Sequence, residues 1–589
     1  MTALEDTWGD CEPVIFLGEW CKRYELRDVW SKRRGETVKF HWDDRAKLRR
    51  DYDCLAALHQ SLLGSLTQSL NELHRVDYSA RYWQILLDPW LMTYLSAIFD
   101  RWECLRIAFE ENNNIGVIWL DGIESSLAPF SYAEFIDAVA YSDEWNQCIY
   151  QRIIKSEYSS KCSIQSRLPF VRRENDRFGA VAMQRQSIIR KAISFGDRIL
   201  GRIFTNYDVI FVGATFKWPA LIRLNMALGQ VPRFFLEEFH PVSRLPGLSA
   251  SGVCDRADLR PDFQPKSRFE EFIKYWIIHD LPRCLVEDYA AMRNRATHMA
   301  ISTKAIATGS SHWVDAFVKM WVAEQVNKGV KLVILEHGGS LPPYKELFDF
   351  EADIADIRVS WFLPYHLKHV RLPPPKIVGR YTNWPSVFRR LIGRKKYCSF
   401  IGNECPRWAF RAHFYPMAYQ WSTSFNMTLL LYGGLSEEVK EWFRVKPYPS
   451  QGWNTRQRFM DILGFDKIFS EKSLDHVYSA SKVIVCSYPE TTFSEAMASG
   501  VPTILIYPEH LYELNPVALP LLESLKAAKI VFHDPMAAAA HLNAIWADPS
   551  AWWGSPAVLH ARSEFHRQAL GTDRKWLKKW VAFLRGVVA

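Results

Sequence analysis

The run KVIVCSYPETTFSEAMASGVPTILIYP, residues 482–508, constrains the fold more than any other feature of the sequence. A short apolar strand leads into a turn, a helix begins near Thr492, and Gly500-Val501-Pro502 separates that helix from a second apolar strand. This pattern predicts two parallel strands joined by a right-handed crossover. Because both strands are apolar throughout, we expect a doubly wound sheet that is covered on both faces.

Similar units form two series along the chain. Strand-like runs of the first series lie at 115–120, 207–214, 301–311 and 330–339, and the second series starts at Lys396–Gly402. Between the two series, the prolines of Leu372–Pro385 cannot continue a helix or a strand, so we predict a linker there. The sequence therefore predicts an α/β fold with an N-terminal domain of residues 1–380 and a C-terminal domain of residues 381–589.

Long helical patterns enlarge the N-terminal domain. Apolar residues recur at three- and four-residue steps, which marks one face of a helix or of a helix pair: Leu48, Tyr52, Leu55, Leu58, Leu62, Leu66, Leu70 and Leu73. A second run follows Asp88–Trp90, with Pro89 near its start, where a missing N–H costs little. The last segment, residues 573–588, is a basic amphipathic helix that can lie on a membrane or pack on the protein itself, including back on the N-terminal domain.

Composition limits the possible partners. The chain has 589 residues, of which 48% are hydrophobic and 23% charged, a globular balance, and its 24 Trp suit either a core or a sugar-binding cleft. The net charge of +8 fits anionic substrates or a membrane surface. No basic stripe interleaved with aromatic residues is present, so we expect no nucleic-acid binding.

Targeting signals are equally limited. The 11 Cys form no CxxC pair, the first residues are acidic and polar, and no apolar run approaches ~18 residues. We therefore expect reduced thiols in a cytoplasmic protein, with any membrane contact peripheral.

The turn and helix that follow the strand at 483–487 form the first candidate site. The N–H groups and the dipole of a helix N-terminus attract an anion, and Thr491, Thr492 and Ser494 add hydroxyl donors. Ligands of open α/β sheets bind at the carboxyl ends of the strands, where this turn lies. The alternative is local: Thr492 and Glu495 have the spacing of a capping box, which needs no ligand.

The block ETTFSEAMASGVPTIL, residues 490–505, resembles the donor-binding segment of GT-B glycosyltransferases. The resemblance implies that Thr491, Thr492 and Ser494 contact the phosphate or nucleotide of a nucleotide sugar. It also implies that Glu495 binds the ribose hydroxyls and that Glu490 lies at the donor site.

A wider resemblance covers most of the chain. The motifs FLGEW, FHWDDR, RYW, DPW, FDRW, EHGG, RVKPYPSQGW and IWADPSAWW stand in one order. Together they are similar to a family of surface-polysaccharide transferases found near nonulosonic-acid biosynthesis genes and distantly similar to capsule-type β-Kdo transferases. This resemblance implies a GT-B-like pair of doubly wound, Rossmann-like domains that face a cleft. It also implies a CMP-activated ulosonic acid donor and a surface glycan or lipid-linked saccharide acceptor at the cytoplasmic face of the inner membrane.

EHGG forms the second candidate site. Glu336 and His337 follow a strand and so lie at the carboxyl edge of a sheet, where a histidine with a pKa of about 6.5 can exchange a proton near neutral pH. Gly338 and Gly339 permit positive φ and close backbone approach to a ligand. We predict catalytic roles for His337 and Glu336 and substrate positioning for the glycines; a structural turn is the alternative. The family usually has glutamine before this histidine, so Glu336 departs from its pattern.

FHWDDR supplies the carboxylates of Asp43 and Asp44. Either can act as the base or the nucleophile of glycosyl transfer. Alternatively, one of them caps the helix that begins near Arg45 and the other pairs with Arg45.

Two further groups complete the predicted site. Ser310 and His312 lie at a predicted helix start, which can position an anionic acceptor; helix capping by the serine explains the same pattern. Arg444 and Lys446 can neutralise the donor phosphate or simply face solvent. Because basic groups and a helix dipole can stabilise the leaving group, and no DxD-like pair ends a strand, we predict no metal and no cofactor beyond the nucleotide sugar.

The sequence thus predicts a metal-independent GT-B glycosyltransferase that transfers a sugar from a CMP-linked donor. Two alternatives remain: a UDP- or GDP-sugar transferase or epimerase of the same fold, and a non-catalytic glycan-binding scaffold.

Overall fold

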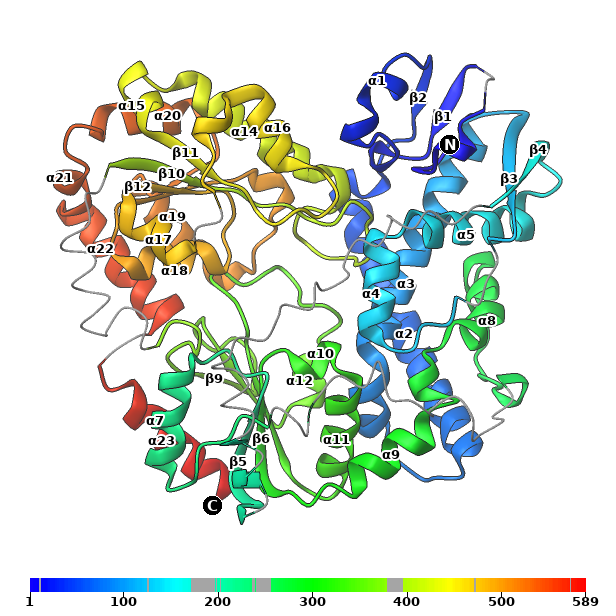
Figure 1. The fold of residues 1–589 in the computed structure, drawn as a ribbon, viewed down its shortest axis with the longest axis horizontal. Helices are drawn as coiled ribbons and strands as arrows, with labels where there is room; N and C mark the ends of the chain where they lie inside the picture. The colour runs from blue at the N-terminus through cyan, green and yellow to red at the C-terminus, as the bar shows by residue number, and fades with distance from the viewer. Residues whose placement is uncertain are drawn as a thin grey trace.

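The computed structural model describes the chain except for residues 10–11, 124–126, 171–195, 198, 202, 236–238, 240–255, 379–395, 471–472 and 572–573. Two parallel sheets of five strands each lie in separate halves of the molecule, with long helices beside both (Figure 1). The predicted α/β fold is confirmed. The predicted boundary at residue 380 lies outside the described residues.

The first sheet holds the EHGG strand at its centre. Its order is β5 (Asn206–Val212), β6 (Ser302–Thr308), β7 (Lys331–Leu335), β8 (Ile357–Ser360) and β9 (His369–Arg371), all parallel. These described strands follow one another in sequence order, without the reversal of a doubly wound sheet. Both faces are nevertheless buried, because alternate side chains of β6 and β7 enter two different apolar clusters.

The second sheet has the reversed order. It runs β11 (Phe443–Lys446), β10 (Tyr397–Ile401), β12 (Ser481–Cys486), β13 (Thr503–Ile506) and β14 (Val531–Phe532), again all parallel. The chain passes from β10 outward to β11 and then returns to add β12 on the other side of β10. This reversal places the carboxyl ends of β10 and β12 at a switch point, where doubly wound sheets bind ligands.

The helical enlargement of the first half is confirmed. α2 (Arg45–His74) buries the predicted apolar face, and it packs along α3 (Ala80–Glu111). α3 begins earlier than predicted, with Ser79 as its N-cap, so Pro89 lies inside the helix rather than near its start. Burial of α3 on nearly all sides keeps it helical despite the proline. Further helices of this part are α4 (Tyr132–Tyr141), α5 (Asp143–Ile153), α8 (Arg268–Asp280), α9 (Tyr289–Thr297) and α11 (Ala316–Asn327).

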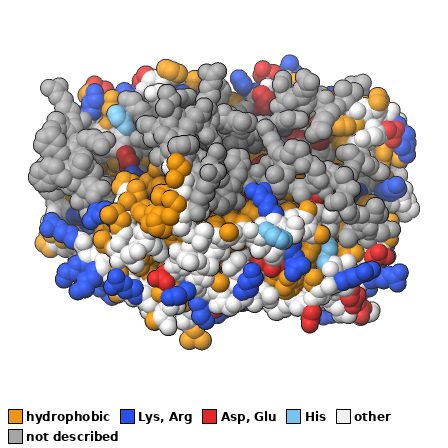
Figure 2. All heavy atoms as spheres, turned by 60° about the horizontal axis from the view of Figure 1, so that its bottom comes forward, with side chains coloured by type: hydrophobic (Ala, Val, Ile, Leu, Met, Phe, Trp, Pro, Cys, Tyr) orange, Lys and Arg blue, Asp and Glu red, His pale blue; other side chains and the backbone are white. Residues whose placement is uncertain are grey.

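The last helix, α23 (Trp576–Val588), crosses from the second half and packs on the first sheet beside α7 (Trp218–Leu228) (Figure 1). Trp576, Trp580 and Leu584 are buried there, and the Trp580 indole donates to the Pro373 carbonyl at 2.9 Å. The apolar side of this amphipathic helix is therefore covered by protein. Lysine and arginine side chains rim the face of the molecule that Figure 2 shows, where hydrophobic side chains also gather. Within the described residues, no helix has the length and apolar character that crossing a membrane requires.

The N-terminal helices also hold the second half directly. Arg407 donates to the Trp20 carbonyl at 2.6 Å and to the Asp143 carboxylate at 2.5 Å. The Arg101 guanidinium, which is fully buried, donates to the Ala409 carbonyl. These contacts fix the segment that follows β10 against the first half, next to the carboxyl edges of both sheets.

Candidate active site

A cavity of about 220 Å³ lies between the two halves. The first half contributes the loop after β7 and α12 (Phe350–Ile354), and the second half contributes the segment after β10 and the start of α18 (Thr491–Ser499). The described residues that line it are Trp313, Glu336–Pro343, Lys345–Leu347, Phe350, Glu351, Arg358, Arg411, His413–Tyr415 and Glu490.

The two predicted sites meet at this cavity. A Cβ added to Gly338 would lie 2.2 Å from the Thr491 Oγ1, so the glycine lets the EHGG loop touch the start of α18. Next to it, the Leu341 N–H approaches the Pro489 carbonyl at 3.5 Å. Gly338 and Gly339 are absent from the described glycines with positive φ. Close approach therefore explains the Gly338 position, and neither glycine uses the positive φ that its lack of a side chain permits.

Glu336 shapes the loop. Its carboxylate accepts from the Trp361 N–H at 2.6 Å, and its carbonyl accepts from the Trp361 indole at 2.8 Å. Burial raises the pKa of Glu336 to about 7, although Arg358 and the Trp361 N–H act in the opposite direction. The carboxyl thus faces the cavity at a pKa suited to proton exchange while one of its oxygens is committed to the loop.

His337 is the open group of the cavity wall. Its side chain is exposed, and it has no hydrogen-bond partner within the described part of the chain. The surrounding protein shields the ring from water, which disfavours the charged imidazolium and lowers the pKa of His337. The nearby His312, Lys376 and Arg411 lower this pKa further, whereas Glu351 raises it. His337 is therefore neutral at pH 7 and can accept a proton.

A buried ionic network forms the cavity floor. Arg358 donates to Glu351 at 3.0 Å and to Glu346 at 2.5 Å. Glu351 also accepts from the Trp313 indole at 2.7 Å and bonds the His312 ring at 3.1 Å. Burial alone would raise the pKa of Glu351, but Arg358 and His312 outweigh it and hold that pKa well below its usual range.

This network corrects the prediction for His312. The ring is fully buried between Thr308, at 3.4 Å, and Glu351, so it supports the floor and does not contact a substrate directly. Ser310 donates to the Gly213 carbonyl at 3.3 Å and does not cap the following short helix with its side chain. It ties the end of β6 to the end of β5, outside the described lining of the cavity.

The donor-side helix begins one residue earlier than predicted. Glu490 is its N-cap but makes no capping hydrogen bond, and Gly500 closes the helix with φ +75°. The capping-box alternative for Thr492 and Glu495 is wrong, because Thr492 lies inside the helix and its hydroxyl bonds Tyr488. The Glu490 carboxyl lines the cavity, and burial raises its pKa to about 7.

Deeper in α18, Ser494 and Glu495 are buried. The Ser494 hydroxyl has no hydrogen-bond partner among the described residues, and Tyr478 donates to Glu495 at 3.3 Å. Lys376, from the first half, reaches Glu495 at 3.7 Å. A cation from one half thus pairs with a carboxylate inside α18 of the other half.

The capping alternative is confirmed for Asp44, while catalysis by Asp43 or Asp44 stays a prediction without support from the cavity lining. Asp44 caps α2, where its carboxylate accepts from the N–H groups of Ala46 and Lys47 at 2.9 and 3.0 Å. Asp43 accepts from Tyr419 at 2.8 Å and from Gln420 at 2.9 Å, so it joins the two halves. Neither is among the described residues that line the cavity.

Arg45 does not pair with either aspartate in the way the sequence suggested. Its guanidinium donates to Glu513 at 2.7 Å. FHWDDR is therefore a junction motif: it starts a helix and ties that helix to the second half.

The prediction for Arg444 is also corrected. Its guanidinium donates to the carbonyls of Glu441 and Phe443 at 2.8 and 2.7 Å, at the amino end of β11 and thus away from the carboxyl edge. Lys446 ends β11 but is not among the described residues that line the cavity.

A family model, LIC12162 family transferase, matches residues 1–584. The chain belongs to this transferase family. The predicted transferase class is confirmed, while no curated protein matches the chain.

Solved structures with weak likeness include three enzymes. MurG from Acinetobacter baumannii is 11% identical, with 65% of this chain and 100% of MurG covered at a TM-score of 0.30. The trehalose 6-phosphate synthase of Burkholderia multivorans is 13% identical, with 51% of this chain and 77% of the synthase covered. The wall teichoic acid polymerase TagF is 10% identical, with 52% of this chain and 76% of TagF covered. The TM-score is 0.29 for both. Likenesses this weak assign no substrate and no residue role to the LIC12162 family chain.

Arg411 and His413, which line the cavity from the second half, were not among the predicted site residues. Arg411 donates to the Tyr132 hydroxyl at 2.7 Å and lies over the Trp313 ring, while burial and Arg411 lower the pKa of His413 to about 3. Their only signal in the sequence is the segment RAHFYP, residues 411–416, which mixes basic with aromatic residues and matches no known motif. Arg358 was signalled only by its position inside a strand.

One group of side chains in the described residues has the geometry to hold a metal: His41, Asp100 and Cys104. All three are buried among the N-terminal helices, and Asp100 already pairs with Arg101 at 2.8 Å. The cluster shares no residue with the described cavity lining, so metal independence of the reaction stays a prediction.

Proposed function

We propose that this transferase moves a sugar from a nucleotide-sugar donor onto an acceptor hydroxyl in the cavity between the two halves. The observation that carries the proposal is the meeting of the EHGG loop with the start of α18, at the Gly338–Thr491 contact. It brings the carboxyl edge of the first sheet to the switch-point edge of the second, and one cavity there holds His337, Glu336 and Glu490. Nucleotide-binding sheets use this edge.

The donor phosphate binds at the start of α18. Its N–H groups and dipole attract an anion, the Thr491 hydroxyl adds a donor, and Lys376 supplies a positive charge from the opposite half. Glu495 binds the ribose hydroxyls, as the resemblance to GT-B enzymes implies.

The sugar is a CMP-activated ulosonic acid, Kdo-like or nonulosonic. The family resemblance supports this choice. An ulosonic donor carries a sugar carboxylate besides its phosphate, and Arg411 and Lys345 line the cavity beyond the helix start. A second anionic group on the substrate would pair with Arg411, since Lys345 already bonds Asp53.

His337 acts as the proton acceptor. The acceptor O–H gives its proton to the neutral imidazole while its oxygen forms a bond to the anomeric carbon. The bond from that carbon to the phosphate oxygen breaks, and CMP leaves with the electron pair. Lys376 and the α18 N-terminus stabilise the charge that develops on the leaving phosphate. The acceptor is a surface glycan or lipid-linked saccharide, reached at the cytoplasmic face of the inner membrane.

The test is a thermal-shift panel with CMP, CDP, UDP and GDP on the full chain, followed by assays of nucleotide release. We expect CMP or CDP to stabilise the protein and Thr491→Val to weaken that effect. His337→Ala should retain nucleotide binding and lose transfer, whereas Glu438→Gln, on the exposed surface of α15 (Glu437–Trp442), serves as the matched control. Stabilisation by UDP or GDP alone would overturn the ulosonic donor. Stabilisation by none of the four would overturn glycosyl transfer.

A further inference from the structure

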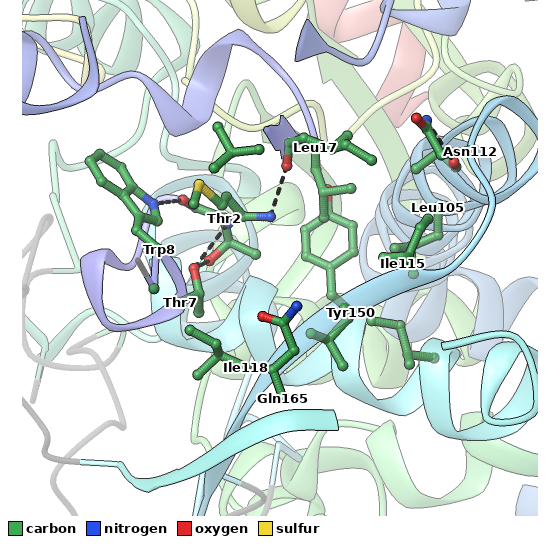
Figure 3. A pocket seen from close by; sticks show the side chains of 18 of the residues that line it. Thr2, Thr7, Trp8, Leu17, Leu105, Asn112, Ile115, Ile118, Tyr150 and Gln165 are labelled. Atoms are coloured by element: carbon green, nitrogen blue, oxygen red, sulfur yellow. Dashed lines mark hydrogen bonds between the residues drawn. The ribbon is translucent and has the colours of Figure 1, made fainter. Parts of the chain in front are cut away.

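A second cavity, of about 400 Å³, lies among the N-terminal elements (Figure 3). Its walls come from the first residues of the chain, the end of α3, α5, and the paired strands β3 (Ile115–Asp121) and β4 (Cys162–Pro169). It shares none of its described lining residues with the cavity between the halves. We propose that it is a separate binding site for an uncharged sugar unit.

Polar atoms without partners point to a ligand. Tyr150 and Gln147 line the cavity from α5 and are only 1% and 4% exposed. The Gln147 Oε1 makes no hydrogen bond with any described residue, and the Tyr150 hydroxyl reaches only the Cys104 thiol, which is a weak partner. A buried polar atom left without a partner costs about 1–3 kcal/mol, and native proteins leave few of them without a ligand or water to bond. Two groups are thus available to a ligand: a hydroxyl that can donate and accept a hydrogen bond, and an amide oxygen that can accept one.

Further amide and hydroxyl groups surround these two. Gln165 extends its amide from β4 into the cavity, and Thr2 and Thr7 lie across from it (Figure 3). Asn112 and its two neighbours, at the end of α3, form part of the rim. Sugar hydroxyls both donate and accept, which is the pairing that such groups offer.

The charge of the cavity selects against ions. Among the described lining residues, Glu12 has the only charged side chain, and the N-terminal ammonium of Met1 donates to the Ile15 carbonyl at 2.9 Å. A carboxylate or phosphate would lose its hydration without gaining a cationic side chain, which is costly, and the Met1 ammonium is already bonded to a carbonyl while burial lowers its pKa. The remaining wall is apolar, with Leu17, Leu105 and Ile115 available to the C–H face of a sugar ring (Figure 3).

Apolar wall, amide groups and an absence of cationic side chains together fit a neutral pyranose and distinguish this cavity from the one between the halves. The site would hold one neutral sugar unit of a longer glycan, while the rest of that glycan lies outside this cavity. Binding here does not depend on the proposed transfer reaction.

Saturation-transfer NMR on the full chain tests the proposal, with the methyl glycosides of glucose, galactose, mannose and N-acetylglucosamine as probes and glucuronic acid as the charged comparison. We expect saturable binding of at least one neutral probe and none of glucuronic acid. Tyr150→Phe should weaken the binding about fivefold, the effect of one neutral hydrogen bond. Because the only partner of that hydroxyl among the described residues is the Cys104 thiol, a weak acceptor, the variant should stay close to the wild-type melting temperature. Gln165→Ala, at an exposed position, should weaken it without loss of stability.

His337→Ala separates this site from the cavity between the halves. It should bind the neutral probe as the wild type does, and Tyr150→Phe should keep stabilisation by nucleotides. The proposal is overturned if no neutral probe binds, if both pocket variants bind it normally, or if His337→Ala abolishes the binding.

Discussion

Replacing Glu490 by glutamine should make the protein more stable at alkaline pH and leave it unchanged in acid. Burial raises the pKa of Glu490 from 4.5 to about 7. At about 1.4 kcal/mol for each pKa unit, ionising this carboxyl in the folded protein costs up to about 3 kcal/mol more than in the unfolded chain. Because the side chain is partly accessible to solvent, we expect about 2 to 3 kcal/mol.

The pH range follows from the direction of the shift. Below pH 4.5 the carboxyl is protonated in both states, so the wild type and Glu490→Gln should have the same free energy of unfolding. As the pH rises, the unfolded state ionises first, and the wild type loses stability relative to the variant until the folded state ionises near pH 7. Above that pH the difference should stay constant.

Urea unfolding between pH 4.5 and 8.5, followed by tryptophan fluorescence, measures this difference. Glu438→Gln is the matched control, since Glu438 is exposed on α15. A difference between the wild type and Glu490→Gln that does not change with pH would refute the argument. So would a wild type that gains stability, relative to the variant, as the pH rises.

Three further substitutions test other parts of the structure. Gly338→Ala places a Cβ 2.2 Å from the Thr491 Oγ1, so it should cost about 1–3 kcal/mol in urea unfolding, and adding Thr491→Ala should restore part of that stability; lack of rescue would contradict the close contact. Trp580→Ala removes a fully buried indole and its bond to the Pro373 carbonyl and should cost about 3–5 kcal/mol in chemical denaturation, whereas the exposed Lys578→Ala should stay within about 0.5. Arg358→Met leaves Glu351 without its buried cation and should cost about 3–5 kcal/mol at pH 7, with a smaller loss at pH 4.5; an equal loss at both would contradict the ion-pair network.

The second sheet and its helix could be predicted because their signals are local. The strand, turn and helix of residues 482–508 follow one another without interruption, and α18 begins within one residue of the predicted start. EHGG was placed correctly at the end of β7 for the same reason. A strand end and the loop after it are defined by neighbouring residues, so the sequence alone locates them.

The role of FHWDDR could not be predicted, because distant residues decide it. Tyr419 and Gln420 bind Asp43, and Glu513 binds Arg45, across more than half of the chain. Arg411 likewise belongs to no recognisable motif and reaches the cavity only through the packing of the two halves. For these residues the tertiary contacts, and not the spacing, determine which group meets a substrate.

The position of α23 also has a consequence for the order in which the protein can be completed during synthesis. β5 and β6 are made long before α23, yet α23 covers the apolar surface that they and α7 present. Until the ribosome has released residues 576–588, this surface has no cover from its own chain. The nascent first half would thus expose this apolar surface while the entire second half is being translated. A chaperone that binds apolar surface would protect the chain from aggregation during that period.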